Sequence, residues 1–479
     1  RVIYTPCGGG FGGKEEPAIQ IPCALAALRT GRPVKMHLNR EESVRISTKR
    51  HAARIKMKHA ARLDGTITAV HSEAICDAGA YMSLTQPVVF RSTVMAAGPY
   101  EVENVRAEAW GVYTTKNPGG AFRGFGSTQV TFAVEVQMDR LAAALGIDPV
   151  ELRLRHALAP GKINAFGHRL SKGIGFVDTL RLVQSELSRL TPELERLKVE
   201  AEAEGKRIGI GVASSFKNVG LGKGVPDAAG AGIEVDENAG VTVYVGATDM
   251  GQGSDTVFAQ RASTELGLPY ESVTVVSSDT ASCPDGGMTT ASRQTFVTGN
   301  AVVAAARKVR ERLIELGTAE EEGGTDGPRS QGGAGSPRYL EVQSVRRVVA
   351  AEGGTLRIDT VYQAPRTYPL QRYADGRAGV GEEEFAVHFG YCFATQGAVV
   401  KVDPESGKLE VLRIVAAQDA GRVLHRQNVI GQIEGGVMMG LGYALQEAYE
   451  VDEKGVGPGS FQKLGVMRIG DMPPVKSFI

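Results

Sequence analysis

Apolar side chains recur at two spacings along the chain, and each spacing predicts a different kind of element. Residues 17–28 and 129–146 carry apolar side chains near helical spacing, and the second run ends on Gly146, a residue that commonly terminates a helix. Two runs with apolar and polar residues in alternation flank the Asp64-Gly65 pair, which predicts a β-hairpin. The chain therefore combines long helices with paired strands.

Two later segments share one pattern of strand, V-D-x-x-x-G turn, strand and glycine-containing loop. They cover residues 231–253 and 397–421. A weak internal duplication explains this pattern, and so does chance, because hairpins with such turns are common. Between them, residues 317–338 are poor in apolar side chains and rich in Gly, which predicts a surface loop or linker.

Composition narrows the class of protein. Apolar residues make up 42% of 479 positions, enough for a large core, and 54 basic residues balance 54 acidic ones. With this balance, the chain lacks the excess of basic residues that is expected of a nucleic-acid binder. No apolar run approaches the ~18 residues of a membrane span, and no signal peptide is visible, so a cytoplasmic protein is expected. The five Cys residues never form C-x-x-C, which argues against an iron–sulfur or zinc site in this chain.

Glycine is the unusual residue, with 61 of 479 positions against a typical share of ~7%. Much of it lies in loops that precede predicted helices, at residues 8–13, 123–126, 250–253 and 431–436, and a Ser/Thr-rich stretch at 286–294 leads into a further helix. A helix N-terminus presents unsatisfied N–H donors and is a potential anion site. Tight-turn packing explains one such loop, but five indicate a large ligand with phosphate and many polar atoms.

Familiar nucleotide and hydrolase motifs do not fit. Residues 8–14 read G-x-x-x-x-G-K, as in a P-loop, but the next residue is Glu15, where a Ser or Thr should bind Mg²⁺. No G-x-G-x-x-G opens a βαβ unit, and no G-x-S-x-G supplies a nucleophilic Ser. A P-loop NTPase, a Rossmann protein and a serine hydrolase are therefore excluded.

The glycine loops together resemble one family, the molybdenum hydroxylases, that is, the molybdopterin-binding portion of xanthine dehydrogenases and aldehyde oxidases. The matching segments are "GGGFGGKEE", "GAFRGFGSTQ", "DMGQGSD", "TTASRQTFVTGNAV" and "GQIEGGVMMGLGYAL". They follow the family order from residue 8 to residue 445, so the resemblance covers nearly the whole chain. It is closest to the xanthine dehydrogenase branch.

The resemblance implies a molybdopterin cofactor, either Mo-molybdopterin or its cytosine dinucleotide, with the molybdenum held by the pterin dithiolene and not by protein side chains. This accords with glycine loops and no metal-ligand cluster. The implied cofactor-binding residues are Gly10, Phe11, Gly12, Arg123, Gly251, Gln252, Ala291, Ser292, Gln294, Thr295 and Gln432. For the Gln and Ser residues, helix capping is the alternative.

The family hydroxylates an electron-poor carbon with water as the oxygen source, and the resemblance implies a purine, xanthine or hypoxanthine, as substrate. Glu15 and Arg91 match residues of the purine branch, and Phe125 matches a stacking Phe. A second stacking Phe is replaced by Val212 or shifted to Phe216. The alternatives are an aldehyde, another N-heteroaromatic such as nicotinate, or a non-catalytic binding remnant of the fold.

The family's general-base Glu lies in a G-x-G-E segment, which we expect beyond Ile479, so no catalytic residue is assigned in this chain. The segment "GVGE" at 379–382 precedes the 431–436 motif, which is the wrong order, and a loop role is expected for it. The chain thus resembles a fragment. The [2Fe-2S] clusters and FAD are expected on partner subunits or in missing segments.

The resemblance implies an α+β fold with mixed β-sheets and helices in two elongated molybdopterin-binding domains, with the cofactor between them. The C-terminal part of the first domain is expected at 1–165, a junction at 166–206, and the second domain, truncated at its C-terminus, at 207–479. Family members commonly form dimers of multi-subunit units. An iron–sulfur subunit and an FAD subunit are therefore the expected partners, with no nucleic acid and no membrane.

Overall fold

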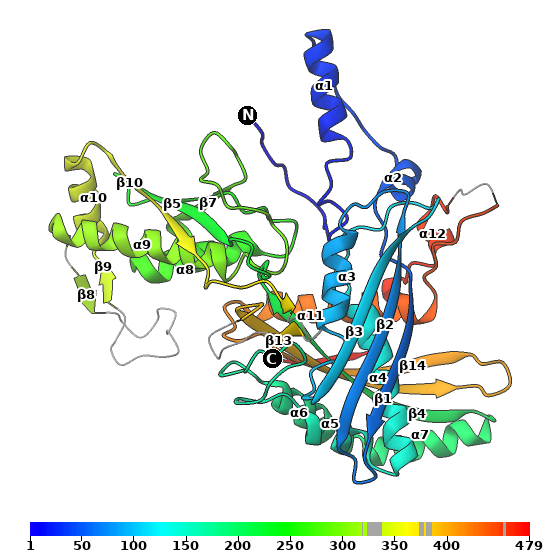
Figure 1. The fold of residues 1–479 in the computed structure, drawn as a ribbon. Coiled ribbons are helices and arrows are strands. Elements are labelled where there is room, and N and C mark those ends of the chain that lie inside the picture. Colours follow the sequence, from blue (N-terminus) through cyan, green and yellow to red (C-terminus); the bar gives the residue numbers. More distant parts are fainter. Residues whose placement is uncertain (319, 323–337, 373–377, 380–385, 454–456) are drawn as a thin grey trace. The chain divides into compact units, whose positions relative to one another are not determined.

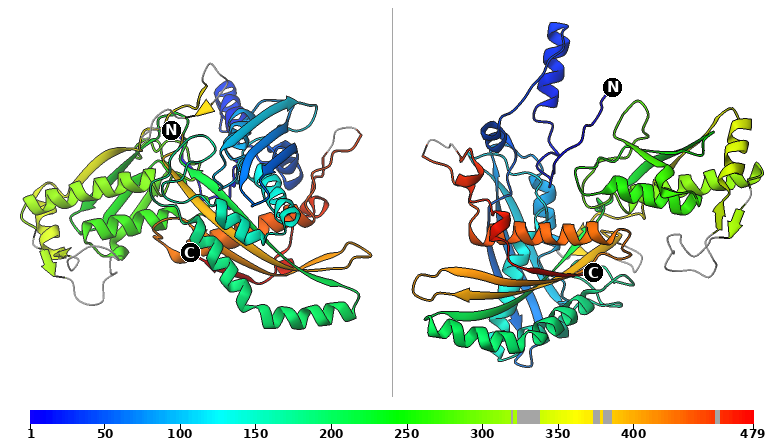
Figure 2. Two further views of the ribbon diagram at one scale, coloured as in Figure 1. Left: turned by 60° about the horizontal axis from the view of Figure 1, so that its bottom comes forward. Right: turned by 180° about the vertical axis from the view of Figure 1, so that it is seen from behind.

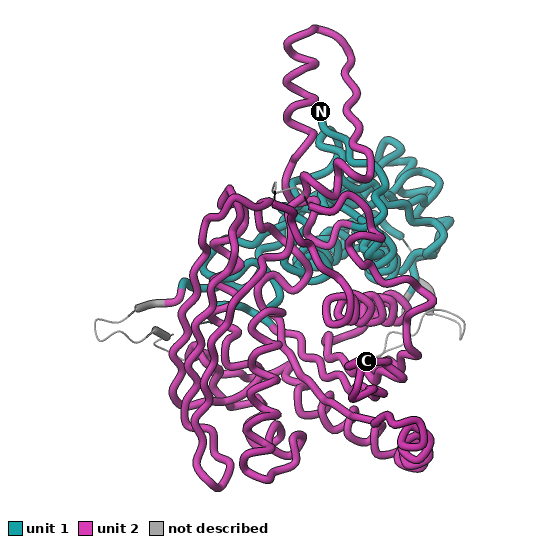
Figure 3. The backbone as a smooth tube through the Cα atoms, turned by 90° about the vertical axis from the view of Figure 1, so that its right-hand side faces the viewer, with its two compact units in different colours: residues 1–9, 218–369, 386–390 teal, residues 10–217, 370–385, 391–479 magenta. Residues whose placement is uncertain are grey.

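The computed structural model describes residues 1–479 except 319, 323–337, 373–377, 380–385 and 454–456. Most of the expected linker at 317–338, and the "GVGE" segment beyond its first residue, lie outside the described residues. The chain forms two compact units, one of residues 1–9, 218–369 and 386–390 and the other of residues 10–217, 370–385 and 391–479 (Figure 3). The domain limits expected at 165 and 207 stay a prediction about the family's domains and are not the limits of these units.

The first unit is built on one mixed sheet. It contains β5 (Ala228–Asp236), β6 (Val241–Val245), α8 (Ser254–Leu266), the 3₁₀ helix η1 (Tyr270–Ser272), β7 (Val273–Ser277), α9 (Val297–Glu315), β8 (Glu320–Glu322), β9 (Arg338–Leu340), α10 (Val342–Ala351) and β10 (Thr355–Gln363). The strand order is β10-β5-β6-β7, with β6 and β7 parallel and the other neighbours antiparallel. The short strands β8 and β9 pair separately.

The core of the first unit lies between this sheet and the helices α8 and α9 (Figure 1). Ile233 and Val243 of the sheet are fully buried with Phe258 of α8 and Val302 of α9. The hairpin predicted from the V-D-x-x-x-G pattern joins β5 to β6, and Asp236 Oδ1 accepts from the backbone N–H of Asn238 and of Gly240, each at 2.8 Å. A capped turn and alternating apolar residues therefore set this sheet, as the sequence predicts.

The second unit holds the remaining elements. They are α1 (Gln20–Thr30), α2 (Arg40–Ile46), β1 (Ala53–Ala61), β2 (Ile67–Gly79), α3 (Thr85–Val94), β3 (Asn104–Tyr113), α4 (Ser127–Leu145), α5 (Pro149–His156), α6 (Phe176–Arg189), α7 (Thr191–Ala203), β4 (Arg207–Val219, whose last two residues belong to the first unit), β11 (Gln371–Arg372), β12 (Ala378–Gly379), β13 (Gly390–Val402, whose first residue belongs to the first unit), β14 (Leu409–Asp419), α11 (Arg426–Leu445), α12 (Phe461–Leu464), η2 (Ile469–Asp471) and β15 (Val475–Phe478). Of the helices in the described part of the chain, none has both the length and the apolar character that crossing a bilayer requires.

Two larger mixed sheets organise the second unit. The predicted hairpin forms β1 and β2, and β3 adds in parallel to β2. The other sheet has the order β15-β14-β13-β4. Helix α6 packs Val183 and Leu187 on one face of this sheet, and α11 packs Ile433 and Val437 on the other (Figure 2). Helices on both faces of mixed sheets confirm the predicted α+β class.

A buried polar network explains why β4 belongs to the second unit. Glu135 of α4 accepts from Arg153 of α5 at 2.9 Å, from Tyr100 Oη at 2.7 Å and from the Ser214 backbone N–H of β4 at 2.9 Å. Arg153 is fully buried, and Glu135 and Tyr100 are almost so. Buried charges require such complete pairing, and breaking one partner is strongly destabilising. The network therefore links α4 and α5, which follow the β1-β2-β3 sheet along the chain, to strand β4 of the other sheet in this unit.

One buried group of the second unit makes its stability depend on pH. Strand β1 packs against α4, where Gln137 Nε2 donates to the Met57 carbonyl oxygen at 3.0 Å. His59 of β1 has both ring nitrogens buried without a hydrogen-bond partner. Burial lowers the pKa of His59 from 6.5 to about 4. The folded chain therefore keeps this imidazole neutral at acid pH, where the unfolded chain binds a proton.

We expect His59 to reduce the stability of the fold as pH falls from about 6.5 to about 4. His59→Leu removes this titration and the two unpartnered nitrogens, so the free energy of unfolding should fall less steeply over that pH range than in the parent. Urea denaturation at a series of pH values measures the slope. His37→Leu, at an exposed histidine, is the matched control and should keep the parent's slope. Equal slopes in the parent and His59→Leu would contradict the prediction.

Candidate cofactor site

The first glycine loop contains a tight turn at residues 10–13, which belong to the second unit. The Gly13 N–H donates to the Gly10 carbonyl oxygen at 2.9 Å, and Phe11 has a positive φ of 53°. Gly12 has φ 96°, and a Cβ there would lie 2.8 Å from the carbonyl carbon of Ala121. Only glycine permits this approach. The helix predicted after this loop is present as α1, but it begins only at Gln20, so the loop does not form the N-terminus of that helix.

The second glycine loop packs against the first. The Arg123 N–H donates to the Phe11 carbonyl oxygen at 2.8 Å. Phe125 has φ 51°, and Gly126 is the N-cap of α4 with φ 93°. A Cβ on Gly126 would lie 2.2 Å from the Val88 carbonyl oxygen of α3. Thus α3 fixes the second loop, which in turn holds the first, and the predicted residues Phe11, Arg123 and Phe125 lie together.

Arg123 also reaches the predicted residue Gln432. Arg123 Nη2 donates to the Gln432 carbonyl oxygen at 2.7 Å and lies 3.4 Å from its Oε1. A Cβ on Gly435 or Gly436 would come within 3.5–3.7 Å of the guanidinium. Residues 431–436 lie inside α11, whose N-cap is His425, so the prediction that they form a loop before a helix is wrong. The glycines let Arg123 lie close to the helix surface instead.

Arg50 is part of this arrangement, and the sequence does not reveal it. Its guanidinium carbon lies 4.4 Å from the ring centroid of Phe122 and 4.7 Å from that of Tyr443 on α11. Arg50 also donates to the Arg123 carbonyl oxygen at 2.7 Å and to Thr128 Oγ1 at 2.8 Å. One side chain therefore joins the second glycine loop, the start of α4 and α11. No motif signals this role, because the partners come from three distant segments.

Arg91, predicted to bind substrate, lies on α3 and is 6% exposed. Burial lowers the pKa of Arg91 to about 10. Half-buried Lys217 of β4 has its pKa lowered to about 7 by burial and by the positive charge of Arg91. Glu15 lies in the turn after the first glycine loop and is exposed. Arg91 and Lys217 therefore lie close enough in the second unit for the charge of Arg91 to act on Lys217.

The two candidates for the second stacking Phe differ in burial. Val212 packs into the core between α6 and the sheet. Phe216 is 4% exposed, and its ring lies 6.0 Å from that of Phe393 and 5.7 Å from that of Tyr391. Phe216 is therefore part of the core of the second unit, whereas Val212 and Phe125 are each only half-buried. Of these three side chains, Val212 and Phe125 keep accessible surface.

The remaining predicted residues belong to the first unit. Gly251 and Gly253 have φ of 99° and 81°, and the Gly9 N–H donates to the Met250 carbonyl oxygen at 2.8 Å. Gln252 uses its amide within the same loop: Oε1 accepts from the Met250 N–H at 2.6 Å, and Nε2 donates to the Thr248 carbonyl oxygen at 2.9 Å. Gln252 therefore stabilises the conformation of its own loop. This agrees with the alternative in which the Gln side chain caps the backbone and does not bind the cofactor.

The start of α8 holds two carboxylates. Asp249 Oδ1 accepts from the N–H of Gly251 at 2.8 Å, and Asp249 Oδ2 accepts from the N–H of Asp255 at 3.0 Å. Burial, together with the negative charge of Asp249, raises the pKa of Asp255 to about 6. While Asp255 is ionised, an anion at the N-terminus of α8 would therefore meet negative charge. At the N-terminus of α4, by contrast, no side chain forms a capping hydrogen bond.

The Ser/Thr-rich segment before α9 is strained. Ala291 and Ser292 have φ of 51° and 53°, and the Ala291 carbonyl oxygen accepts from the Gly220 N–H at 3.0 Å. Ser292 and Thr295 are exposed, whereas Gln294 is 7% exposed and donates to Thr289 Oγ1 at 2.9 Å. Gln294 therefore stabilises the loop through its side-chain amide, while Ser292 and Thr295 face solvent.

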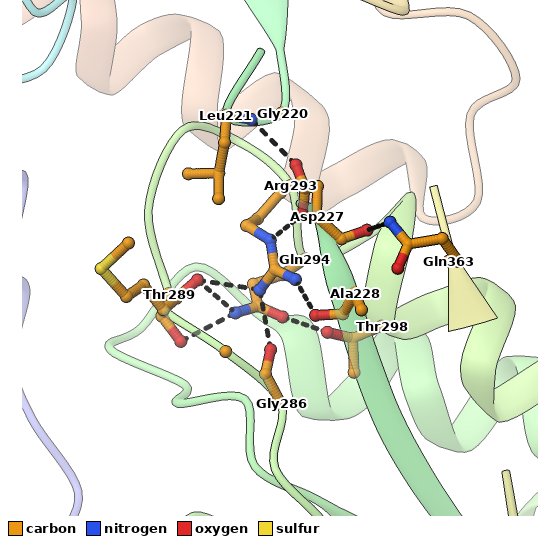
Figure 4. A network of polar contacts seen from close by, with 12 residues as sticks. Gly220, Leu221, Asp227, Ala228, Gly286, Thr289, Arg293, Gln294, Thr298 and Gln363 are labelled. Atoms are coloured by element: carbon orange, nitrogen blue, oxygen red, sulfur yellow. Dashed lines mark hydrogen bonds and ion pairs between the residues drawn. The ribbon is translucent and has the colours of Figure 1, made fainter. Parts of the chain in front are cut away.

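Arg293 determines the shape of that segment (Figure 4). It is 1% exposed, and its Nε donates to Asp227 Oδ1 at 2.6 Å. Arg293 Nη1 donates to the carbonyl oxygens of Gly286 at 2.7 Å and Met288 at 2.9 Å. Asp227 in turn accepts from the Leu221 N–H at 2.8 Å. Both neighbours of Arg293 are among the predicted residues but Arg293 is not, because charge pairing with Asp227 is not visible in a linear motif.

Backbone strain is concentrated at the predicted residues. In the described part of the chain eight non-glycine residues have positive φ, and Phe11, Phe125, Ala291 and Ser292 are four of them. Each such residue costs of order 1–3 kcal/mol and persists only where surrounding contacts enforce it, typically at ligand sites. The predicted residues form two groups, one in each unit, and both show this strain.

Comparisons with known proteins identify the family of this chain. Residues 187–473 and residues 1–157 each match a family described as a molybdopterin cofactor-binding domain. The chain is 33% identical over 478 residues to a probable xanthine dehydrogenase subunit of Bacillus subtilis, covering 99% of this chain and 61% of that relative. It is 44% identical over 180 residues to the nicotinate dehydrogenase large molybdopterin subunit of Eubacterium barkeri, covering 38% of this chain and 42% of that relative.

The fold is similar to that of a solved aldehyde oxidoreductase. The aldehyde oxidoreductase of Desulfovibrio desulfuricans superimposes with a TM-score of 0.81 at 27% identity, over 98% of this chain and 48% of that one. The chain therefore belongs to the molybdopterin cofactor-binding family, among the xanthine dehydrogenase-like molybdenum hydroxylases that its motifs predict. It spans 61% of the Bacillus subtilis relative and 48% of the solved enzyme.

Removing the Arg293 guanidinium should destabilise the first unit strongly. Arg293→Met leaves Asp227 buried with an uncompensated charge, and the expected loss is about 3–5 kcal/mol of unfolding free energy. Arg307→Met is the matched control on α9, because Arg307 forms an exposed ion pair with Glu265 and should lose no more than about 1 kcal/mol. Denaturant unfolding of both variants measures the difference. Equal losses would show that Arg293 does not hold the loop.

Proposed function

We propose that this chain is the molybdopterin-binding catalytic portion of an oxidoreductase that hydroxylates an electron-poor carbon of a purine, with water as the oxygen source. The proposal rests on one observation: in a chain of the molybdopterin-binding family, Arg123 forms hydrogen bonds to both Phe11 and Gln432. These residues come from three motifs that are far apart in the sequence. Their convergence supports a cofactor-binding surface and argues against a set of unrelated turns.

The residues present fit a large polar cofactor. A Cβ on Gly8 or Gly431 would meet nothing within 4 Å, so space is open beside both segments, and Gly251 would meet only the Cys7 carbonyl oxygen, at 4.0 Å. We infer that the backbone of Gly10, Phe11 and Gly12, the side chain of Arg123 and the exposed Ser292 and Thr295 hold the cofactor. When bound, the molybdenum cofactor supplies the two-electron oxidation chemistry. The protein supplies hydrogen bonds, shape and charge.

Some of the predicted residues act indirectly in this proposal. Gln252 and Gln294 fix the loops that carry Gly251, Ala291 and Ser292, because their amides bond within those loops. Gln432 offers its carbonyl oxygen to Arg123 and thereby orients the guanidinium. Arg50 donates to the backbone carbonyl oxygen of Arg123 and thereby holds the loop that carries this side chain. Positioning of this kind matters because displacements of about 1 Å strongly affect catalysis.

Purine selectivity rests on Arg91 and Glu15. Hydroxylation of a purine drives negative charge onto its ring carbonyl oxygens, and a guanidinium that faces such an oxygen stabilises the transition state more than the bound ground state. Arg91 is buried, so its charge acts in a medium of low dielectric. The Glu15 carboxylate can accept a ring N–H and orient the heterocycle. Phe125 offers a half-buried ring for stacking.

A nicotinate-like substrate is the second candidate. One relative with 44% identity over 180 residues is a nicotinate dehydrogenase large subunit, and two cations, Arg91 and Lys217, lie near one another in the second unit. A carboxylate on the substrate would be attracted by both charges. Since the pKa of Lys217 is about 7, this attraction should weaken as the pH rises above 7. An aldehyde offers neither a ring N–H nor a carboxylate to these groups.

In this proposal the [2Fe-2S] clusters and FAD belong to other parts of the enzyme. Relatives are named as subunits of larger enzymes, which supports an iron–sulfur subunit and an FAD subunit as partners here. A general base is not assigned in this chain. We propose that the cofactor is Mo-molybdopterin or its cytosine dinucleotide, and that the working enzyme is a dimer of multi-subunit units.

Cofactor content tests the family role directly. The chain purified from a host that makes the molybdenum cofactor should contain molybdenum and pterin, which elemental analysis and pterin fluorescence measure. Arg123→Met should lower both, because it removes the side chain that faces Gln432. Arg140→Met, at an exposed position of α4, is the control and should leave both unchanged. Parent protein with neither component would favour a non-catalytic remnant.

Substrate preference tests the purine assignment in the complete enzyme. Arg91→Met should reduce kcat on xanthine by about 10²-fold or more, the scale for loss of one oxyanion stabiliser. Glu15→Val should weaken purine turnover while sparing or improving aldehydes. If both variants oxidise purines like the parent, or the parent prefers nicotinate or aldehydes, the purine assignment is wrong. In the nicotinate case, Lys217→Met should raise KM for nicotinate and flatten its dependence on pH above 7.

A further inference from the structure

One histidine and two glutamates gather on a single face of the β1-β2-β3 sheet. His71 and Glu73 are two positions apart on β2, so their side chains leave the strand on the same face. Glu108 of β3 is directly opposite Glu73 in the parallel pair. The three residues therefore converge through strand register and not through a loop. None of them belongs to the candidate cofactor site.

The distances between the three side chains match an incomplete coordination shell. His71 Nε2 lies 3.6 Å from Glu73 Oε1 and 3.7 Å from Glu108 Oε2, and the three potential ligand atoms lie within 4.8 Å of one another. His71 Nε2 is buried and makes no hydrogen bond. In a tetrahedral zinc site with bonds of about 2.0–2.1 Å, ligand atoms are about 3.4 Å apart. Small side-chain rotations would bring the three atoms to that spacing.

Charge on this face favours a cation between the glutamates. Glu73 and Glu108 are like charges directly opposite each other, an arrangement that destabilises a strand pair. Arg106 Nε and Nη2 donate to the Glu108 carboxylate at 3.1 and 3.2 Å, and the Arg106 side chain is 73% exposed. An exposed ion pair of this kind is weak and screened by salt. It can yield one carboxylate oxygen to a metal ion.

The neighbouring strand limits how tightly a cation can bind. Lys56 and Lys58 of β1 are the register partners of Glu73 and His71. Their positive charges partly offset those of the glutamates. The site should therefore bind a metal less tightly than a structural zinc site does, and reversibly, since the side chains of His71, Glu73 and Glu108 are 34%, 37% and 36% exposed.

We propose that His71, Glu73 and Glu108 form a binding site for a divalent transition-metal ion such as Zn²⁺, with water completing its coordination. An imidazole nitrogen beside two carboxylates selects zinc over magnesium and calcium, which prefer oxygen ligands. The bound ion would bridge β2 and β3 and relieve the repulsion between Glu73 and Glu108. The site is independent of the molybdenum cofactor and of the proposed reaction.

Zinc titration of the full 479-residue chain tests the proposal. After dialysis against a chelator, the parent should bind one Zn²⁺ that is lost or weakened at least tenfold in His71→Ala and in Glu108→Gln, as measured by competition with a zinc-sensitive dye. His37→Ala, at an exposed histidine outside the cluster, should bind like the parent. Circular dichroism confirms that each variant is folded. Mg²⁺ at the same concentrations should not compete.

Arg106→Ala provides the sharper test, because it removes the cation that competes for Glu108. Zinc should bind severalfold more tightly to this variant than to the parent. If Glu108 were not a zinc ligand, loss of the exposed ion pair would leave zinc binding unchanged. Unchanged zinc binding in His71→Ala, unchanged or weaker binding in Arg106→Ala, or equal competition by Mg²⁺ would each overturn the proposal. Absence of zinc binding to the parent would do so as well.

Discussion

The hydrogen bond from the Arg123 N–H to the Phe11 carbonyl oxygen is the contact on which the second unit's part of the site depends. It joins two glycine loops, and it can form only because Gly12 and Gly126 have no Cβ where backbone atoms lie 2.8 and 2.2 Å away. The same contact places the Arg123 side chain against the glycine-rich surface of α11. Close backbone packing, rather than a cluster of ligating side chains, therefore builds this surface, as suits a cofactor that carries its own metal ligands.

Each unit also uses a buried or stacked arginine to hold a strained segment. In the first unit Arg293 pairs with Asp227 and binds the carbonyl oxygens of the loop that contains Ala291 and Ser292. In the second unit Arg50 contacts the loop around Arg123. Both arginines donate to backbone carbonyl oxygens of their loops, which helps make positive φ at neighbouring non-glycine residues tolerable. The strain at the predicted residues thus has an identifiable source of support in each unit.

Several features of the fold could be predicted because they depend on local patterns. The Asp64-Gly65 turn specifies the β1–β2 hairpin, and the apolar spacing before Gly146 specifies α4. The predicted entries to α4 and α8 are confirmed, with Gly126 and Gly253 as N-caps. The prediction for 431–436 was wrong because glycine has two uses: it can open a loop, or it can let another group approach a helix. Only the neighbouring Arg123 distinguishes them.

The sequence by itself determined the family, the hairpins around Asp64-Gly65 and the V-D-x-x-x-G turns, and the motif residues, since these follow from short-range order and motif spacing. The tertiary structure decided which of those residues lie together, and that Gln252 and Gln294 bond within their own loops. It also decided that Phe216 is buried and that Val212 packs against the core. It alone revealed Arg50 and Arg293. The partners that the sequence could not reveal, Arg123 and Tyr443 for Arg50 and Asp227 for Arg293, are dozens to hundreds of residues away along the chain. The charge pairing, stacking and burial that define these roles arise only when distant segments pack.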